Sequence, residues 1–210
     1  MLRIWYNLFM GTFFTSDTHF GNDGIIEREN RPFKNWKQFA RKTIRTWNKQ
    51  AGKDDVIYFL GDFVYCFPGV ETDFEKAYKL VKKIRAKVVL ILGNNDEMIM
   101  KLHFDDDFEK FCSFLCECGF LDVKREEFLN VDGLKIYLNH KPSNFKAGYV
   151  NLFGHTHRTT GLWKPFGLNV GCDLNHFRLY DMAEIERLLD LKTKYWDDDK
   201  DNLCMGGKND

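Results

Sequence analysis

The sequence predicts an α/β fold, and three observations carry that prediction. Apolar runs that read as buried strands alternate with amphipathic helical segments along the first half of the chain, which is typical of a layered α/β domain. Past residue 121, short strand-like runs dominate and are joined by turns, which indicates a second sheet rather than a second domain. With 210 residues, 44% of them hydrophobic, the chain is long enough for one well-buried domain and short for two.

The first half of the chain is expected to hold three buried strands separated by helices. The strands are predicted at 12–16, 56–60 and 88–92. Asn35 is an N-cap for a helix over 36–47, whose apolar residues recur three and four positions apart and form one stripe. A second amphipathic helix is predicted over 72–85.

The second half is expected to add helices at 98–102 and 108–118, strands at 122–131, 134–139, 149–153 and 166–170, and a last helix at 182–191. We expect residues 1–191 to form a single domain and residues 192–210, which have no apolar period, to be a solvated tail. Residues 1–9 are too short to span a membrane or to act as a signal peptide, so they are interpreted as a non-native extension upstream of Met10.

The net charge limits the kinds of partner that are expected, and the cysteine content indicates the redox compartment. Lysine plus arginine and aspartate plus glutamate both number 31, so no basic tail or stripe predicts binding of long duplex nucleic acid. The Arg and Lys residues of the helices are interpreted as solvated faces. Six cysteines without an export signal favour reduced thiols in a cytoplasmic protein, and no membrane partner is expected.

Metal-binding types of residue follow five of the predicted strands. They are Asp17, His19, Asp62, Asn94, His140, His155 and His157. An open α/β sheet keeps its site at the carboxyl ends of its strands. Positions two apart in a strand point to the same face, so Asp17 is expected to converge with His19, and His155 with His157.

The composition of this set indicates the kind of metal. Carboxylate, carboxamide and imidazole ligands without a thiolate suit Mn, Fe, Zn, Ni or Co rather than a structural zinc site. Seven side chains are too many for one tetrahedral ion but suit two divalent ions that share a carboxylate.

The same residues resemble, in order, the five sequence blocks of the calcineurin-like metallophosphoesterases. These blocks are D-x-H at Asp17 and His19, G-D at Gly61 and Asp62, G-N at Gly93 and Asn94, then His140, and G-H-x-H at 154–157. The resemblance covers about residues 10–190 and is strongest to a small bacterial and phage branch. It implies a four-layer αββα sandwich with two mixed β-sheets flanked by helices.

The resemblance also implies a ligand set and a reaction. Asp17, His19, Asp62 and His157 would bind one ion, while Asp62, Asn94, His140 and His155 would bind the other. Manganese is the favoured metal. A hydroxide held between the two ions would attack a phosphodiester or an activated phosphomonoester of nucleotide size or smaller.

One position departs from the family pattern. The family has a histidine after the metal-binding asparagine, and here that place is taken by Asn95. An amide cannot deliver a proton at neutral pH, and general acid catalysis is typically worth about 10²–10⁴ in rate. We therefore expect a preference for good leaving groups, with Asp96 as support for the site and His176 as an alternative proton donor.

Two further residues and two other functions complete the expectations. Asn22 and Arg158 are candidates for contact with the substrate phosphate. A metal-binding interaction scaffold whose catalysis has lapsed is one alternative, and Asn95 is its only support. A nuclease acting on polymers is the other, and the neutral net charge disfavours it.

Overall fold

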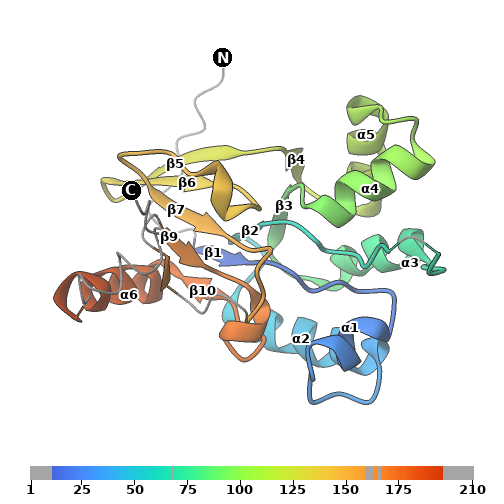
Figure 1. The fold of residues 1–210 in the computed structure, drawn as a ribbon, viewed down its shortest axis with the longest axis horizontal. Helices are drawn as coiled ribbons and strands as arrows, with labels where there is room; N and C mark the ends of the chain where they lie inside the picture. The colour runs from blue at the N-terminus through green and yellow to red at the C-terminus, as the bar shows by residue number, and fades with distance from the viewer. Residues whose placement is uncertain (1–10, 68, 159–162, 165–166, 196–210) are drawn as a thin grey trace, which may run out of the picture.

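The computed structural model describes residues 11–67, 69–158, 163–164 and 167–195. The expected extension at 1–9 and residues 196–210 of the expected tail lie outside this part of the chain. The described residues form two five-stranded mixed sheets with helices around them (Figure 1), which confirms the predicted fold class. No helix in the described ranges is both long enough and apolar enough to cross a membrane.

The first sheet carries the alternating β/α half of the chain. Its order is β10-β1-β2-β3-β4, with β1 (Thr12–Thr15), β2 (Val56–Phe59), β3 (Lys87–Ile91) and β4 (Asp122–Lys124) parallel, and β10 (Tyr180–Asp181) antiparallel to β1. Between the strands lie α1 (Gly24–Arg28), α2 (Trp36–Gln50), α3 (Phe74–Tyr78), the 3-10 helix η1 (Lys79–Lys83), α4 (Asn94–His103) and α5 (Phe108–Cys118).

The second sheet has the order β5-β6-β7-β9-β8. Its strands are β5 (Glu127–Val131), β6 (Leu134–Leu138), β7 (Val150–Phe153), β8 (Trp163–Lys164) and β9 (Gly167–Asn169); β6, β7 and β9 are parallel, and β5 and β8 are antiparallel edges. Two short 3-10 helices, η2 (Pro142–Asn144) and η3 (Cys172–Leu174), and the last helix, α6 (Met182–Tyr195), complete the described elements.

Two hydrophobic clusters hold these layers together. One face of the first sheet packs under α2 to α5 through residues such as Phe59, Trp47 and Phe111. The other face meets the second sheet, where Leu60 and Ile91 pack with Leu138 and with residues of α6. Burying a side chain of this size contributes about 1.5–3 kcal/mol, so the clusters fix the sheets face to face with their parallel strand ends at one edge.

The predicted helix capped by Asn35 is confirmed, because the Asn35 side chain accepts a hydrogen bond from the backbone N–H of Gln38 at 2.9 Å. Three predicted boundaries are wrong. The segment 72–85 divides into α3 and η1, and 122–131 divides into β4 and β5, which belong to different sheets. The alternation of apolar and polar residues in 122–131 does not reveal that the chain passes from one sheet to the other within this segment.

The third wrong boundary concerns the residues after β3. The sequence predicts a helix only over 98–102, which begins four residues later than the helix in the structure. The structure instead starts α4 at Asn94, since the Asp96 carboxylate accepts the backbone N–H of Gly93 at 2.9 Å and caps the helix. Asn94 and Asn95 are therefore fixed in a first helical turn.

Candidate metal centre

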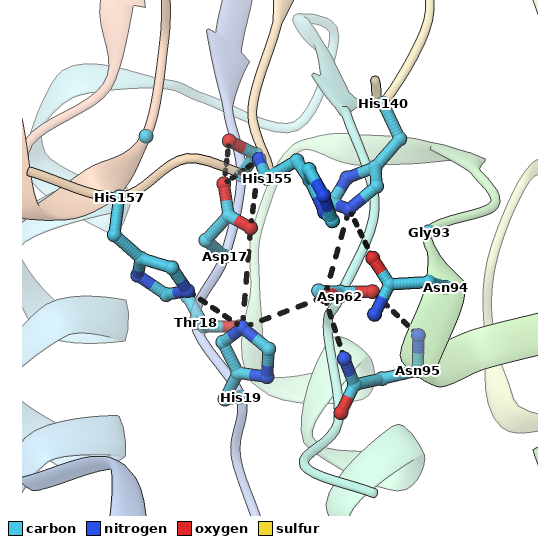
Figure 2. A network of polar contacts seen from close by, with 12 residues as sticks. Asp17, Thr18, His19, Asp62, Gly93, Asn94, Asn95, His140, His155 and His157 are labelled. Atoms are coloured by element: carbon cyan, nitrogen blue, oxygen red, sulfur yellow. Dashed lines mark hydrogen bonds and ion pairs between the residues drawn. The ribbon is translucent and has the colours of Figure 1, made fainter. Parts of the chain in front are cut away.

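The seven predicted ligands converge where the two sheets meet, as Figure 2 shows. They come from loops after β1, β2, β6 and β7 and from the first turn of α4. Those from the first sheet are Asp17, His19, Asp62 and Asn94, and those from the second are His140, His155 and His157. Both sheets thus supply ligands to one centre.

The convergence does not arise from the strand pleat, so that part of the sequence reasoning is wrong. Asp17 and His19 lie beyond β1, and His155 and His157 lie beyond β7. Each of these four, and also Asp62, has a left-handed backbone, with φ between 44° and 69°. Such conformations cost on the order of 1–3 kcal/mol each and cluster at functional sites.

Neighbouring backbone bonds hold these strained loops in place. The N–H of Asp17 donates to the carbonyl of Gly61 at 3.0 Å, and the N–H of His19 donates to the carbonyl of Asp62 at 2.9 Å. Both oxygens of Asp17 also accept the backbone N–H of His155, at 3.0 and 3.1 Å. The loop from the first sheet is thereby fastened to the loop from the second.

The first group of donors surrounds the Nε2 atom of His19. That atom lies 3.2 Å from Nε2 of His157, 3.5 Å from Oδ2 of Asp62 and 3.9 Å from Oδ1 of Asp17. Two nitrogens that bind one ion at about 2.0–2.1 Å each in tetrahedral geometry would be about 3.3 Å apart. The observed separation of the two imidazole nitrogens fits a shared cation.

The second group lies on the other side of Asp62. Nε2 of His140 is 3.0 Å from Oδ1 of Asn94 and 3.6 Å from Oδ2 of Asp62. The ring of His155 packs edge-on against His140, with the ring centroids 5.1 Å apart. The same carboxylate oxygen of Asp62 therefore faces both groups.

The histidine tautomers and the charges also fit cations. Nδ1 of His140 donates to the carbonyl of Leu60 at 2.7 Å, so Nε2, which faces the centre, is the nitrogen that could bind a cation. Burial lowers the pKa of His19, which keeps that imidazole neutral. Burial raises the pKa of Asp62 to about 7, because it removes water from the negatively charged carboxylate. A bound cation would compensate for that lost solvation.

Three glycines of the sequence blocks are required by the close approach of ligand side chains. A methyl group on Gly61 would collide with the ring of His140, and one on Gly93 would collide with Asp62. One on Gly154 would collide with the carboxylate of Asp17. These three glycines therefore leave the space that the candidate ligand side chains occupy.

Asp96 lies behind the candidate centre and contacts it through the backbone of Asp62. Its wholly buried carboxylate accepts the N–H of Asp62 at 2.8 Å and the hydroxyl of Tyr78 at 2.7 Å, besides capping α4. Asn95 is bound on both sides: its amide donates to Oδ2 of Asp62 at 2.6 Å and accepts the N–H of Cys66 at 2.8 Å. In this arrangement Asn95 fixes the orientation of the Asp62 carboxylate.

The other predicted residues lie farther out. Asn22 is half-buried and accepts the N–H of Gly24 at 2.7 Å, and Arg158 is exposed with its guanidinium 3.9 Å from Oδ1 of Asp173. His176 is exposed in the loop after η3, and no hydrogen bond or ion pair among the described residues joins it to the seven candidate ligands.

Sequence reasoning missed a buried ion pair that holds His157. Arg31 makes two bonds of 2.8 Å to the carboxylate of Asp173, and Oδ2 of Asp173 lies 3.2 Å from Nδ1 of His157. Arg31 also donates to the carbonyls of Thr18 and Asp17 at 2.6 and 2.7 Å. Because 142 residues separate the pair, no local pattern could have indicated it.

Sequence reasoning also missed two sets of neighbours. Nη2 of Arg28 lies 3.2 Å from Nε2 of His157, and Glu29 lies 3.8 Å from the other ring nitrogen. A pocket of about 390 Å³ opens beside Asn94 and His140. Its lining includes Arg125, Asn139, Lys141 and Asn144.

Comparison with known proteins agrees with this architecture. A family model described as calcineurin-like phosphoesterase matches residues 10–201. The uncharacterized protein MJ1445 of Methanocaldococcus jannaschii is 35% identical over 82 residues, which are 39% of this chain and 44% of that protein. The match thus spans less than half of that relative's length.

Two solved structures align with most of this chain. The protein of unknown function AQ665 from Aquifex aeolicus aligns with a TM-score of 0.59 and 20% identity, over 85% of this chain and 99% of that one. Yfce, a phosphoesterase from E. coli, aligns with a TM-score of 0.46 and 17% identity, over 77% of this chain and 78% of that one. On the family match, which spans most of its length, this chain belongs to the calcineurin-like phosphoesterase family.

Proposed function

We propose that residues 1–191 form a single metallophosphoesterase domain that hydrolyses a phosphodiester or an activated phosphomonoester at a centre holding two divalent cations, with manganese favoured. The observation that carries this proposal is the position of Asp62, whose Oδ2 lies 3.5 Å from Nε2 of His19 and 3.6 Å from Nε2 of His140. One carboxylate with an imidazole group on each side is the arrangement that two cations sharing a ligand require.

Each of the two groups of donors is proposed to hold one cation. Asp17, His19 and His157 would hold the first cation together with Asp62, and Asn94, His140 and His155 would hold the second with the same carboxylate. Bound divalent cations supply the activation of water near neutral pH and the neutralisation of charge on the phosphoryl oxygens.

The protein supplies position rather than a nucleophile. Asp173 would hold the ring of His157, Leu60 the ring of His140, and Asn95 the carboxylate of Asp62. Second-sphere bonds of this kind typically change metal affinity or activity by about 10–100-fold when removed.

Substrate recognition is assigned to the pocket beside Asn94 and His140. Its volume of about 390 Å³ suits a small phosphate ester up to nucleotide size. The lining also holds Glu97 and Glu126, and Arg125 lies 3.3 Å from Glu97. Lys141 is therefore proposed to contact the ester in addition to Asn22 and Arg158. The Asn95 amide can donate a hydrogen bond but cannot transfer its proton to a leaving group at neutral pH. The site is therefore proposed to favour leaving groups that depart as stable anions.

The test combines metal content with hydrolysis. Purified protein should contain two manganese ions per chain after reconstitution and should hydrolyse bis-p-nitrophenyl phosphate. His140→Ala should lose hydrolysis by at least about 10²-fold and one metal ion. His103→Ala removes an exposed imidazole that stacks on Phe74, so it serves as the matched control and should change neither.

Two outcomes would contradict the proposal. Hydrolysis by metal-free protein that equals that of the reconstituted protein would exclude a metal-dependent reaction. Two bound metals without hydrolysis of aryl or alkyl esters would leave a metal-binding module in place of an enzyme.

A further inference from the structure

A groove of about 780 Å³ lies between α2 and the α3–η1 segment, outside the metal centre (α2 and α3 in Figure 1). Its apolar lining consists of Trp36, Ala40, Ile44 and Leu80, and none of the seven proposed ligands contributes to it. A cavity of this volume is large enough for several linked groups of a polymeric ligand.

One wall of the groove is a row of positive charges on α2. Lys37, Arg41, Arg45 and Lys49 line it at intervals of four residues, which places them one above another on the same face. The 15 residues of α2 include no aspartate or glutamate. Like charges at this spacing repel, and cations near a helix N-terminus oppose the helix dipole, so the row lowers helix stability.

The opposite wall carries a second row of positive charges. Lys76, Lys79, Lys83 and Arg85 are exposed and line the groove from the α3–η1 side. Among the ion pairs of the described residues, only one involves a member of either row: Lys79 lies 3.4 Å from Glu75, and both side chains are more than half exposed. The lining itself contains no acidic residue.

The two walls are connected by Asn48 at one end of the groove. Its amide donates to the carbonyl of Lys83 at 2.8 Å, and its oxygen accepts the N–H of Arg85 at 2.8 Å. These bonds join α2 to the end of η1, so the groove is formed before any ligand arrives. Eight of the 31 basic residues of a chain with zero net charge therefore meet in one preformed groove.

We propose that this groove binds a single-stranded nucleic acid along its phosphate backbone. Lys37 and Lys49 are 12 residues apart, which is about 18 Å along a helix, and this length matches a short run of linked phosphates. The apolar floor and the Trp36 ring suit the sugars and bases that a single strand exposes.

Other anionic partners fit the groove less well. A duplex hides its bases from the apolar floor, and a flat anionic membrane cannot enter a recess whose charges line two facing walls. An acidic peptide would match the charge, but a run of aspartate and glutamate carries no rings, whereas every nucleotide of a single strand offers a base to Trp36. The two positive rows and the apolar floor together fit the phosphates and the bases of a single-stranded nucleic acid.

Fluorescence anisotropy with a labelled 12-nucleotide oligo-dT and the full chain tests the proposal, with a denaturing gel to show that the oligonucleotide stays intact. If about four phosphates are contacted, affinity should fall about 50-fold between 50 and 200 mM salt. A 12-base-pair duplex, a poly-glutamate peptide and vesicles containing phosphatidylserine should each bind more weakly than oligo-dT.

A pair of charge-matched variants places the binding in the groove. Arg41→Gln with Lys83→Gln removes two lining charges and should weaken binding about 20-fold at 100 mM salt. Lys42→Gln with Lys82→Gln removes two charges from exposed positions on the same elements that do not line the groove, and should change affinity less than threefold.

Three results would overturn the proposal. They are equal losses in the two double variants, an oligo-dT affinity that does not depend on salt, and tighter binding to duplex, peptide or vesicles. Neither double variant should have a thermal midpoint below that of the wild type, and both should retain the wild-type hydrolysis of bis-p-nitrophenyl phosphate. Failure of the groove is therefore distinguishable from failure of the metal centre.

Discussion

Replacing Arg31 tests the buried ion pair that joins the loop after β1 to His157 in the candidate metal centre. The side chains of Arg31 and Asp173 are fully buried and share two bonds of 2.8 Å. Hydrogen bonds from His157 and Arg31 lower the pKa of Asp173, although its burial alone would raise it. Arg31→Met would leave this carboxylate charged, buried and without its cation.

The expected loss follows from the contacts. Breaking one side of a buried pair costs about 3–5 kcal/mol. The carbonyls of Thr18 and Asp17 also lose their donor, at about 1–3 kcal/mol each. Because neighbouring losses are not additive, we expect the free energy of unfolding to fall by at least about 3 kcal/mol.

Urea unfolding at pH 7.5 measures this change, and Arg158→Met is the matched control. Arg158 is about half exposed and lies 3.9 Å from the same carboxylate, so its removal should cost less than about 0.5 kcal/mol. If Arg31→Met does not fold, Arg31→Lys should fold with a smaller loss and with metal affinity reduced about 10–100-fold. An unfolding free energy of Arg31→Met within about 1 kcal/mol of wild type would refute the reasoning.

Three further predictions follow from individual contacts. Asn95→His restores a proton donor, so the ratio of alkyl to aryl phosphate hydrolysis should rise, by up to about 10²-fold to 10⁴-fold, and an unchanged ratio would show that the donor is not limiting. Gly93→Ala should abolish metal binding in a calorimetric titration, because the added methyl group would collide with Asp62, whereas Gly52→Ala, whose nearest neighbour would be 3.7 Å away, should bind normally. In metal-free protein the Asp62 carboxyl should titrate near pH 7 by carbon NMR, because burial raises its pKa to about 7, and zinc should move the midpoint below about 5; a midpoint below 5 without metal would contradict this. A raised native pKa means that the folded state keeps a proton that the unfolded state loses above about 3.9, so this group alone lowers stability as pH rises from about 4 to 7.

The sequence was sufficient to predict the fold class and to select the seven candidate ligands. Each ligand directly follows an apolar run or opens the helix behind one, and parallel strands bring such positions to one edge. It was not sufficient for the local geometry. Left-handed residues at Asp17 and His155 depend on partners from another sheet, so strand periodicity gave the right convergence for the wrong reason.

Long-range features were beyond the reach of local patterns. The pair of Arg31 and Asp173 forms only when η3 packs beside the loop after β1. The spacing of the basic residues on α2 can be recognised in the sequence. The facing row belongs to the α3–η1 segment, and it lies opposite α2 only because the two segments pack together. The exposure of these side chains agrees with their interpretation as solvated faces, and local patterns could not show that the two rows face each other.

The proposed function depends on two cations that share Asp62. A crystal structure of the manganese-loaded protein, with data collected at the manganese absorption edge, tests this sharing most directly. Two anomalous peaks are expected about 3.5–4 Å apart, one beside His19 and His157 and the other beside His140 and Asn94, with Asp62 between them. A single peak, or peaks that do not contact Asp62, would contradict it.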